Sequence, residues 1–166
     1  MSENYIVING KKADLTQEQL KALGIEVKKE DPFKKVTEDE RYYFINSWGG
    51  TVETSMHEND NSDLRWHVAN YCTDEALLLQ QAYRETLNRL LWRFSMEHAG
   101  MCIDWCDDYQ NKYYICFEHS SKKFKVYPRR SEQNVGTVYF NNLTTAELAI
   151  EEIVKPFMAA HPDFKL

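Results

Sequence analysis

The stretch that decides the fold is residues 74–97, which read DEALLLQQAYRETLNRLLWRFSME. At about 100° per residue, its apolar side chains fall on one stripe of a helix. The stripe consists of Leu79, Tyr83, Leu87, Leu90 and Phe94, with Ala82 and Leu91 at its flanks. The sequence therefore predicts one long amphipathic helix whose stripe packs into the core.

Trp92 falls on the opposite side of this helix, among Arg84, Glu85 and Arg89. An exposed indole is unusual on a charged helix face. Two interpretations are open: another part of the chain covers Trp92, or Trp92 marks a protein interface.

The sequence around this helix is repeated. RYYFI at 41–45 recurs as KYYIC at 112–116, and Asn70 with Thr73 recurs as Asn141 with Thr144, at one offset of 71 residues. Each copy has the order strand, turn, strand, loop, strand, helix. The predicted fold is α+β: a duplicated β-β-β-α unit, with an antiparallel sheet and two helices on one face.

The domain predicted from this repeat covers residues 41–166, with units 41–100 and 112–166. The third strand of each unit is expected at 64–71 and at 136–140. Thr73 and Thr144 are suited to cap the two helices at their N-termini. Pro156 is expected to end or kink the second helix near Lys155.

Residues 1–25 predict a separate hairpin–helix module. The β-rich run YIVI at 5–8 precedes Asn9-Gly10, which favours a two-residue hairpin turn. Thr16 and Gln19 form a capping box, and Gly24 suits the position after the helix end. Residues 26–40 are expected to be a linker anchored at Pro32-Phe33. Such a linker allows the module to move, or to exchange between the subunits of a homodimer.

Composition bounds the class of protein. The chain has 166 residues, 43% of them hydrophobic, and a net charge of −6. This content is enough for a core and excludes a disordered or fibrous chain. The sequence predicts no membrane-spanning segment and no secretory signal, so a cytoplasmic location is expected.

No standard catalytic motif is present in the sequence, and a non-enzymatic role is therefore expected. The alternative is a metal-assisted hydrolase built on Asp104, Asp107 and Asp108. His98, Cys102 and Cys106 have the helical spacing of a zinc site, although Gly100 interrupts the stretch. The simpler interpretation is that the cysteines are reduced thiols, and no cofactor is expected.

Charge is concentrated in three segments. The acidic candidates for partner binding are Glu53, Glu58, Asp60, Asp63, Asp104, Asp107 and Asp108. They are solvated loops, or they imitate nucleic-acid phosphates and occupy a basic groove of a partner. The basic segment contains Lys122, Lys123, Lys125, Arg129 and Arg130, with Phe124 and Tyr127 between them. It could bind nucleic acid, or its lysines could protect an exposed strand edge.

Several motifs carry a resemblance to a known group of proteins. INGKK at 8–12, LTQEQL at 15–20, YYFINSWGG at 42–50, NYCTDEAL at 70–77 and LNRLLWRF at 87–94 resemble small proteins encoded by phages and prophages of Firmicutes. Some small proteins from that setting are anti-CRISPR inhibitors of the type II effector nuclease. The resemblance implies a setting of phage–host conflict or a phage accessory role. Together with the missing catalytic motifs and the acidic segments, it leads us to expect a non-enzymatic protein of the bacterial host cytoplasm that binds and inhibits a host defence nuclease, with the type II effector as the leading candidate. The alternative is a phage accessory protein that binds nucleic acid through the basic segment.

Overall fold

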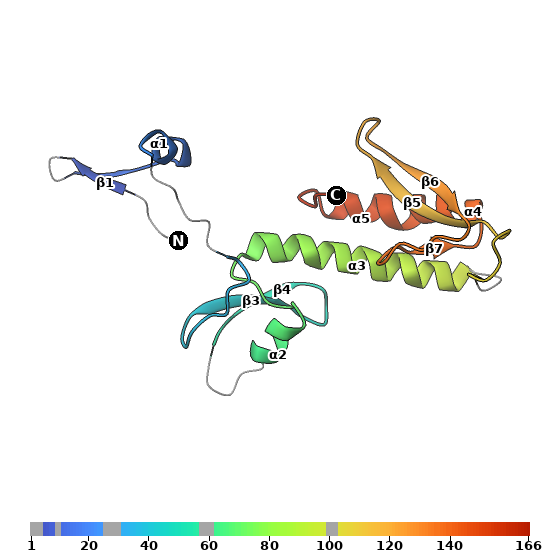
Figure 1. Cartoon of the computed structure of the whole chain (residues 1–166), viewed down its shortest axis with the longest axis horizontal. Helices are drawn as coiled ribbons and strands as arrows, with labels where there is room; N and C mark the ends of the chain where they lie inside the picture. The colour runs from blue at the N-terminus through green and yellow to red at the C-terminus, as the bar shows by residue number, and fades with distance from the viewer. Residues whose placement is uncertain (1–4, 9–10, 25–30, 57–61, 99–102) are drawn as a thin grey trace. The chain divides into compact units, whose positions relative to one another are not determined.

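The computed structural model describes residues 5–8, 11–24, 31–56, 62–98 and 103–166 (Figure 1). The chain divides into two compact units, Met1–Lys34 and Lys35–Leu166. The strands are β1 (Tyr5–Ile8), β2 (Lys11–Asp14), β3 (Arg41–Ile45), β4 (Thr51–Ser55), β5 (Lys112–Glu118), β6 (Lys123–Arg129) and β7 (Tyr139–Phe140). The helices are α1 (Gln17–Ala22), α2 (Ser62–His67), α3 (Glu75–His98), α4 (Leu143–Ala149), the π-helical turn η1 (Ile150–Val154) and α5 (Lys155–Ala160). Within the described ranges, no helix is long and apolar enough to span a membrane.

The first unit has the predicted hairpin and helix. β1 and β2 pair antiparallel, with Tyr5 opposite Asp14. Thr16 and Gln19 form the predicted capping box: the Gln19 amide donates to Thr16 Oγ1, and the Thr16 amide donates to Gln19 Oε1. Gly24 follows the helix with φ +68°, in the left-handed region that glycine tolerates. The predicted Asn9-Gly10 turn lies outside the described residues.

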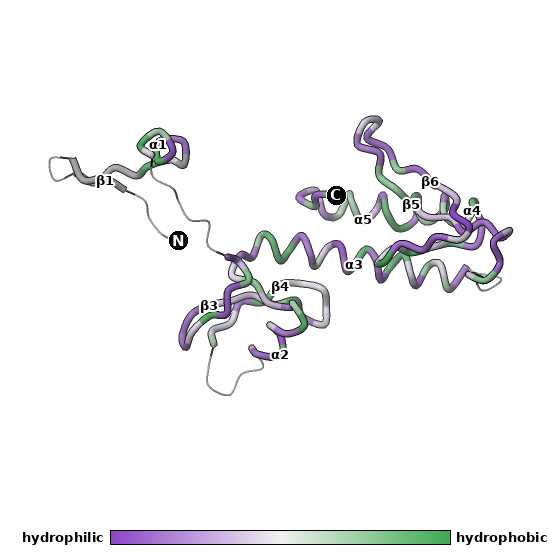
Figure 2. The backbone as a smooth tube through the Cα atoms, in the orientation of Figure 1, coloured by the Kyte–Doolittle hydropathy of each residue, from purple (hydrophilic) through white to green (hydrophobic). Residues whose placement is uncertain are grey.

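The second unit is organised around α3, which has the predicted extent. Its N-terminal half buries Leu78 and Ala82 in one core cluster, with Ile45 and Cys72. Its C-terminal half buries Leu87, Leu91 and Phe94 in another cluster, with residues of α4, α5 and β7. At about 100° per residue, these two sets face sides of the helix about 165° apart. Figure 2 shows hydrophobic and hydrophilic segments alternating along α3, as in an amphipathic helix.

The predicted single stripe is therefore only partly right. Leu87 and Phe94 are buried, whereas Leu79, Tyr83 and Leu90 are half-buried. A single 3.6-residue periodicity cannot represent a helix that turns different sides to two cores.

The first predicted third strand, at 64–71, is wrong, because residues 62–67 form α2. Leu64, Trp66 and Val68 alternate with polar residues along this segment, but all three are exposed. Two other groups occupy the edge of β3. Cys72 pairs with Tyr43 in an isolated bridge, and the Asn70 side chain accepts from the Ile45 amide (2.6 Å) and donates to the Ile45 carbonyl (2.8 Å).

The second hairpin belongs to a three-stranded antiparallel sheet in the order β6-β5-β7. The predicted third strand is present but is only two residues long. The cap of α4 is Asn142, whose Oδ1 accepts from the Thr145 amide (2.7 Å), and not Thr144. Asp74 in turn takes the place predicted for Thr73, since its Oδ1 accepts from the Leu77 amide (3.1 Å). β3–β4 and β5–β6–β7 are separate sheets, so the structure gives no support for a duplicated unit within one sheet.

Pro156 does not end the last helical segment. Residues 150–154 form the π-helical turn η1, and α5 continues from Lys155 with Pro156 in its first turn. A proline inside a regular α-helix would clash with the carbonyl four residues earlier. The wider turn before Pro156 is a recognised way to accommodate such an irregularity.

Lys112, at the start of β5, is fully buried. Its Nζ donates to the carbonyl oxygens of Asp107 (2.5 Å) and Arg130 (2.8 Å) and lies 5.4 Å from the centre of the Trp105 ring. This one side chain thus ties the 103–111 segment to the chain that follows β6.

Replacing Lys112 with methionine removes the buried donor to both carbonyl groups, and the Asp107 carbonyl keeps only the longer contact from the Gln110 amide (3.3 Å). We expect Lys112→Met to lower the free energy of unfolding by about 1–3 kcal/mol. Urea unfolding followed by circular dichroism measures this loss. The matched control is Lys123→Met on the exposed surface of β6, which should change stability by less than about 0.5 kcal/mol. Equal midpoints for the two variants would show that Lys112 does not hold these segments together.

The turn between β3 and β4 is packed tightly on α3. Gly49 has φ +82°, and a Cβ at this position would lie 2.6 Å from Thr86 Oγ1. The Asn46 side chain fixes the same turn, because its Oδ1 accepts from the amides of Trp48 (2.9 Å) and Gly50 (3.1 Å). The turn is therefore held against the middle of α3.

Gly136 provides a matched control for this contact, since it has φ +77° and no atom within 4 Å of a built Cβ. Both Gly49→Ala and Gly136→Ala strain the backbone, but only Gly49→Ala creates a clash. We expect Gly49→Ala to lose about 1–3 kcal/mol more in urea unfolding. Adding Thr86→Ala should remove most of that difference, and Thr86→Val should not. Equal losses at both glycines would contradict the close packing.

Candidate functional site

An exposed aromatic and basic surface lies where the β3–β4 turn meets α3. Its hollow, of about 530 Å³, is lined by residues that include Trp48, Thr86, Arg89, Leu90, Trp92 and Arg93. We call it the tryptophan groove. Trp48 is 91% exposed and Trp92 is 61% exposed. Two large indoles at the surface of one unit are uncommon and are typical of binding sites.

The position of Trp92 follows from the two-sided burial of α3. In the N-terminal half of α3, one side of the helix packs against the β3–β4 hairpin. The same side, continued into the C-terminal half, carries Arg89, Trp92 and Met96. The hairpin ends at its Trp48 turn, beside Thr86, and this side of the helix is exposed beyond that point. The groove is therefore the continuation of a buried helix face.

The two arginines are set along the same helix face. Arg89 lies 3.7 Å from Glu85, and Arg93 lies 3.9 Å from Glu97, each one helical turn away. Exposed pairs of this kind contribute only about 0.3–0.5 kcal/mol. Both guanidinium groups can thus exchange these carboxylates for a partner at little cost.

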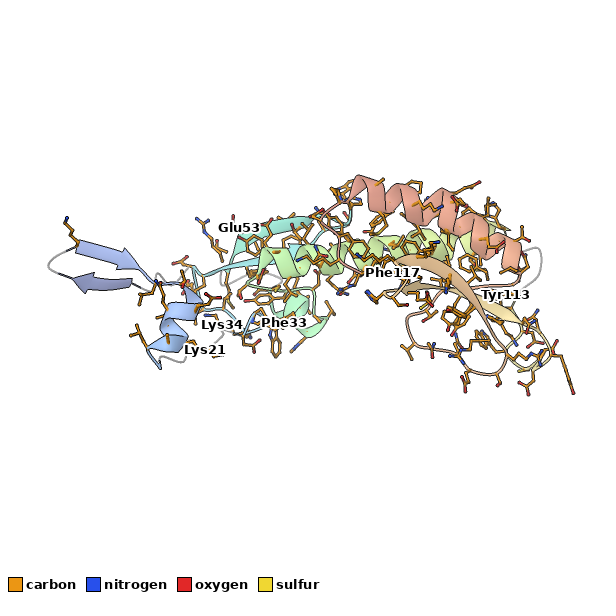
Figure 3. The ribbon with its side chains drawn as sticks, turned by 90° about the horizontal axis from the view of Figure 1, so that it is seen from above. Lys21, Phe33, Lys34, Glu53, Tyr113 and Phe117 are labelled. Carbon is orange, nitrogen blue, oxygen red and sulfur yellow. The ribbon has the colours of Figure 1, made fainter. Side chains whose placement is uncertain are left out.

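The predicted acidic candidates do not form one surface. Glu53 and Asp63 lie on β4 and α2, near the N-terminal half of α3, whereas Asp104, Asp107 and Asp108 follow its C-terminus. The 24 residues of α3 span about 36 Å between these ends. Figure 3 shows Glu53 far from Tyr113, which follows the 103–111 segment.

Several of these carboxylates have partners within the protein. Glu53 pairs with Arg41 (2.9 Å), and Asp63 pairs with Lys35 (2.6 Å). The hydrogen bond from Lys35 is the main cause that lowers the pKa of Asp63. Glu58 and Asp60 lie outside the described residues.

In the 103–111 segment, two of the three aspartates serve the chain's own turns. Asp104 Oδ1 accepts from the Cys106 amide, and Asp107 Oδ1 accepts from the Tyr109 amide, both at 2.8 Å. Asp104 and Asp107 therefore stabilise local turns in this segment. These contacts give no support to the alternative of a metal-assisted hydrolase.

The zinc hypothesis involves Cys102, which lies outside the described residues. His98 stacks on Phe94, with ring centres 3.9 Å apart, and its Nδ1 lies 2.9 Å from the Phe94 carbonyl oxygen. The Cys106 side chain is exposed. No group of three metal-binding side chains occurs among the residues that the structure describes.

The basic candidates lie on and after the β5–β6 hairpin, but they do not all face one way. Lys123, Lys125 and Arg129 project from one side of β6, which is exposed, whereas Phe124 faces the core. Lys122 occupies the turn with φ +52°, and Arg130 follows β6. Phe124 is therefore not placed to stack on a base together with Tyr127.

The structure adds functional candidates that the sequence patterns did not single out. Trp48 lies within the YYFINSWGG motif at 42–50, and no pattern there marks its indole as exposed. Arg89 lies three residues before Trp92 and four residues before Arg93, and this helical spacing was a usable signal. The burial of Lys112 had no signal, because a lysine at a strand start is normally exposed.

Comparisons with known proteins give no further assignment. No protein-family model, curated protein or solved structure matches the chain significantly. The resemblance to phage proteins therefore rests on the sequence motifs at 8–12, 15–20, 42–50, 70–77 and 87–94 alone.

Proposed function

We propose that this is a non-enzymatic phage protein that binds a host defence nuclease in the bacterial cytoplasm and inhibits it. The observation that carries the proposal is the tryptophan groove, with Trp48 and Trp92 exposed beside Arg89 and Arg93. Trp and Arg are the residues most often found at the energetic centre of protein interfaces. The phage-like motifs suggest the type II RNA-guided nuclease as the partner to test first.

The fixed turn at Trp48 supports a binding role. Asn46 and Gly49 hold this turn against α3, so the backbone that carries Trp48 is positioned before any partner arrives. A backbone ordered in advance loses less entropy on binding. The acidic residues, which lie at opposite ends of α3, support the proposal less than the groove does.

The groove also specifies the kind of surface that it fits. The residues that line it include two arginines and no acidic side chain. Charge complementarity therefore favours an acidic protein surface with an apolar side chain that enters between the indoles. This mode differs from imitation of nucleic acid, which would place acidic side chains in a basic channel.

The test is target cleavage by the purified, guide-loaded type II nuclease at rising ratios of this protein. We expect the wild-type protein to suppress cleavage. Trp48→Ala and Trp92→Ala should each raise the concentration needed for half-inhibition at least about tenfold, because both remove a central contact.

Two controls separate the groove from other surfaces. Tyr109→Ala removes an aromatic side chain that is 90% exposed elsewhere, and Glu53→Gln with Asp63→Asn removes acidic charge. Both should inhibit like the wild type. Undiminished cleavage at large excess of the wild-type protein would rule out this nuclease, and loss of inhibition only in the acidic variant would move the site away from the groove.

A further inference from the structure

The outward face of the β5–β6 hairpin carries a second set of basic and aromatic side chains, independent of the tryptophan groove. Phe124 and Val126 of β6 pack against the core. Lys123, Lys125, Tyr127 and Arg129 alternate with them and are exposed. We call these four residues, together with Tyr114 of β5, the lysine–tyrosine face. At about 3.4 Å per residue, the row on β6 is about 20 Å long.

Strand register places aromatic rings side by side across this face. Tyr114 lies opposite Tyr127 on β6 and opposite Tyr139 on β7. The ring centres are 6.1 Å apart for Tyr114 and Tyr127, and 5.8 Å apart for Tyr114 and Tyr139. Trp105 packs edge-on against Tyr139 at 4.9 Å, and Tyr139 is only 6% exposed. Tyr127 is the open end of the row, at 37% exposed.

The opposite side of the β5–β6 hairpin packs against the core. Tyr113 and Ile115 of β5 pack there against the cluster that includes Phe94 and Phe140. Tyr113 and Phe117, at the two ends of that strand face, are labelled in Figure 3. The lysine–tyrosine face is thus the side of the hairpin that the core does not use.

Lys125 and Arg129 flank Tyr127 on the same side of β6. Arg129 lies 5.8 Å from the centre of the Tyr114 ring. Arg129 and Arg130 also line a polar hollow of about 450 Å³. Lys125 pairs with Glu118 at 2.7 Å, and its hydrogen bond is the main cause that lowers the pKa of Glu118. Glu118 and Glu132 offset only part of the positive charge of the two lysines and two arginines.

We propose that the lysine–tyrosine face binds single-stranded nucleic acid. Tyr127 stacks on an unpaired base, and Lys123, Lys125 and Arg129 contact phosphates along the strand. Stacking of bases on aromatic side chains within a basic surface is the usual basis of sequence-tolerant single-strand binding. A duplex keeps its bases stacked on each other, so it cannot use Tyr127 in this way. The other explanation is that the lysines protect the edge strand β6 from aggregation, while Tyr127 packs beside Tyr114 and its hydroxyl donates to Glu118 (3.5 Å). It predicts no binding of single strands.

Fluorescence anisotropy with a labelled oligothymidylate of about 15 nucleotides tests the proposal. We expect binding that weakens as NaCl rises from about 50 to 200 mM. The double variant K123E/K125E should bind at least about tenfold more weakly, and the slope of log K against log salt should fall by about 1.4, because two phosphate contacts are lost. Tyr127→Ala should weaken binding about tenfold, and Tyr127→Phe should retain it.

Glu118→Gln provides a variant with the opposite effect. It removes the acidic side chain that pairs with Lys125, so it should tighten binding by about two- to fivefold. Because this variant gains affinity, loss of folding cannot explain its result.

Matched controls are K11E/K21E, which changes the net charge equally on the first unit, and Tyr109→Ala. Both should bind the oligonucleotide like the wild type. No binding at about 50 mM NaCl, equal affinity for a duplex, or equal weakening by test and control variants would each overturn the proposal. Since this assay contains no nuclease, its outcome is independent of the inhibition test.

Discussion

The burial of α3 from opposite sides at its two ends is the constraint on which the second unit depends. Leu78 and Ala82 face the β3–β4 hairpin, and Leu87, Leu91 and Phe94 face the α4–α5 segment and the second sheet. One 24-residue helix is therefore shared by two small cores, neither of which has another long helix. The Gly49 turn on Thr86 and the Lys112 contacts then hold the adjoining loops against these cores.

The same arrangement creates the candidate binding surface. One side of α3 is buried by the β3–β4 hairpin in its N-terminal half, and no element that the structure describes packs on the same side just beyond the hairpin, so the side chains there are exposed. Here the cover ends at the Trp48 turn, and the side chains that follow are Arg89, Trp92 and Arg93. The lysine–tyrosine face arises in an analogous way, because one side of the β5–β6 hairpin packs on the core and the other is left open. The two surfaces are therefore separate, and each can have its own partner.

Local sequence patterns correctly predicted those helices and strands that are specified by a few neighbouring residues. The capping box at Thr16, the extent of α3 and the hairpin strands are of this kind, because backbone hydrogen bonds and turn chemistry act over short distances. The prediction failed at residues 62–67, where alternation of apolar residues did not correspond to burial. It also misplaced both helix caps, one residue early at Thr73 and two residues late at Thr144, because Asp74 and Asn142 cap the helices instead of the nearby threonines.

The sequence by itself determined that this is an α+β protein with a long central helix, antiparallel hairpins and an unusual indole at Trp92. Tertiary structure alone decided which side of α3 is buried at each end, that Trp48 and Trp92 line one groove, that the acidic segments lie apart, and that Lys112 is buried. The physical reason is that burial and proximity depend on packing between segments distant in the chain. Helical or strand periodicity records only the average surroundings of one segment.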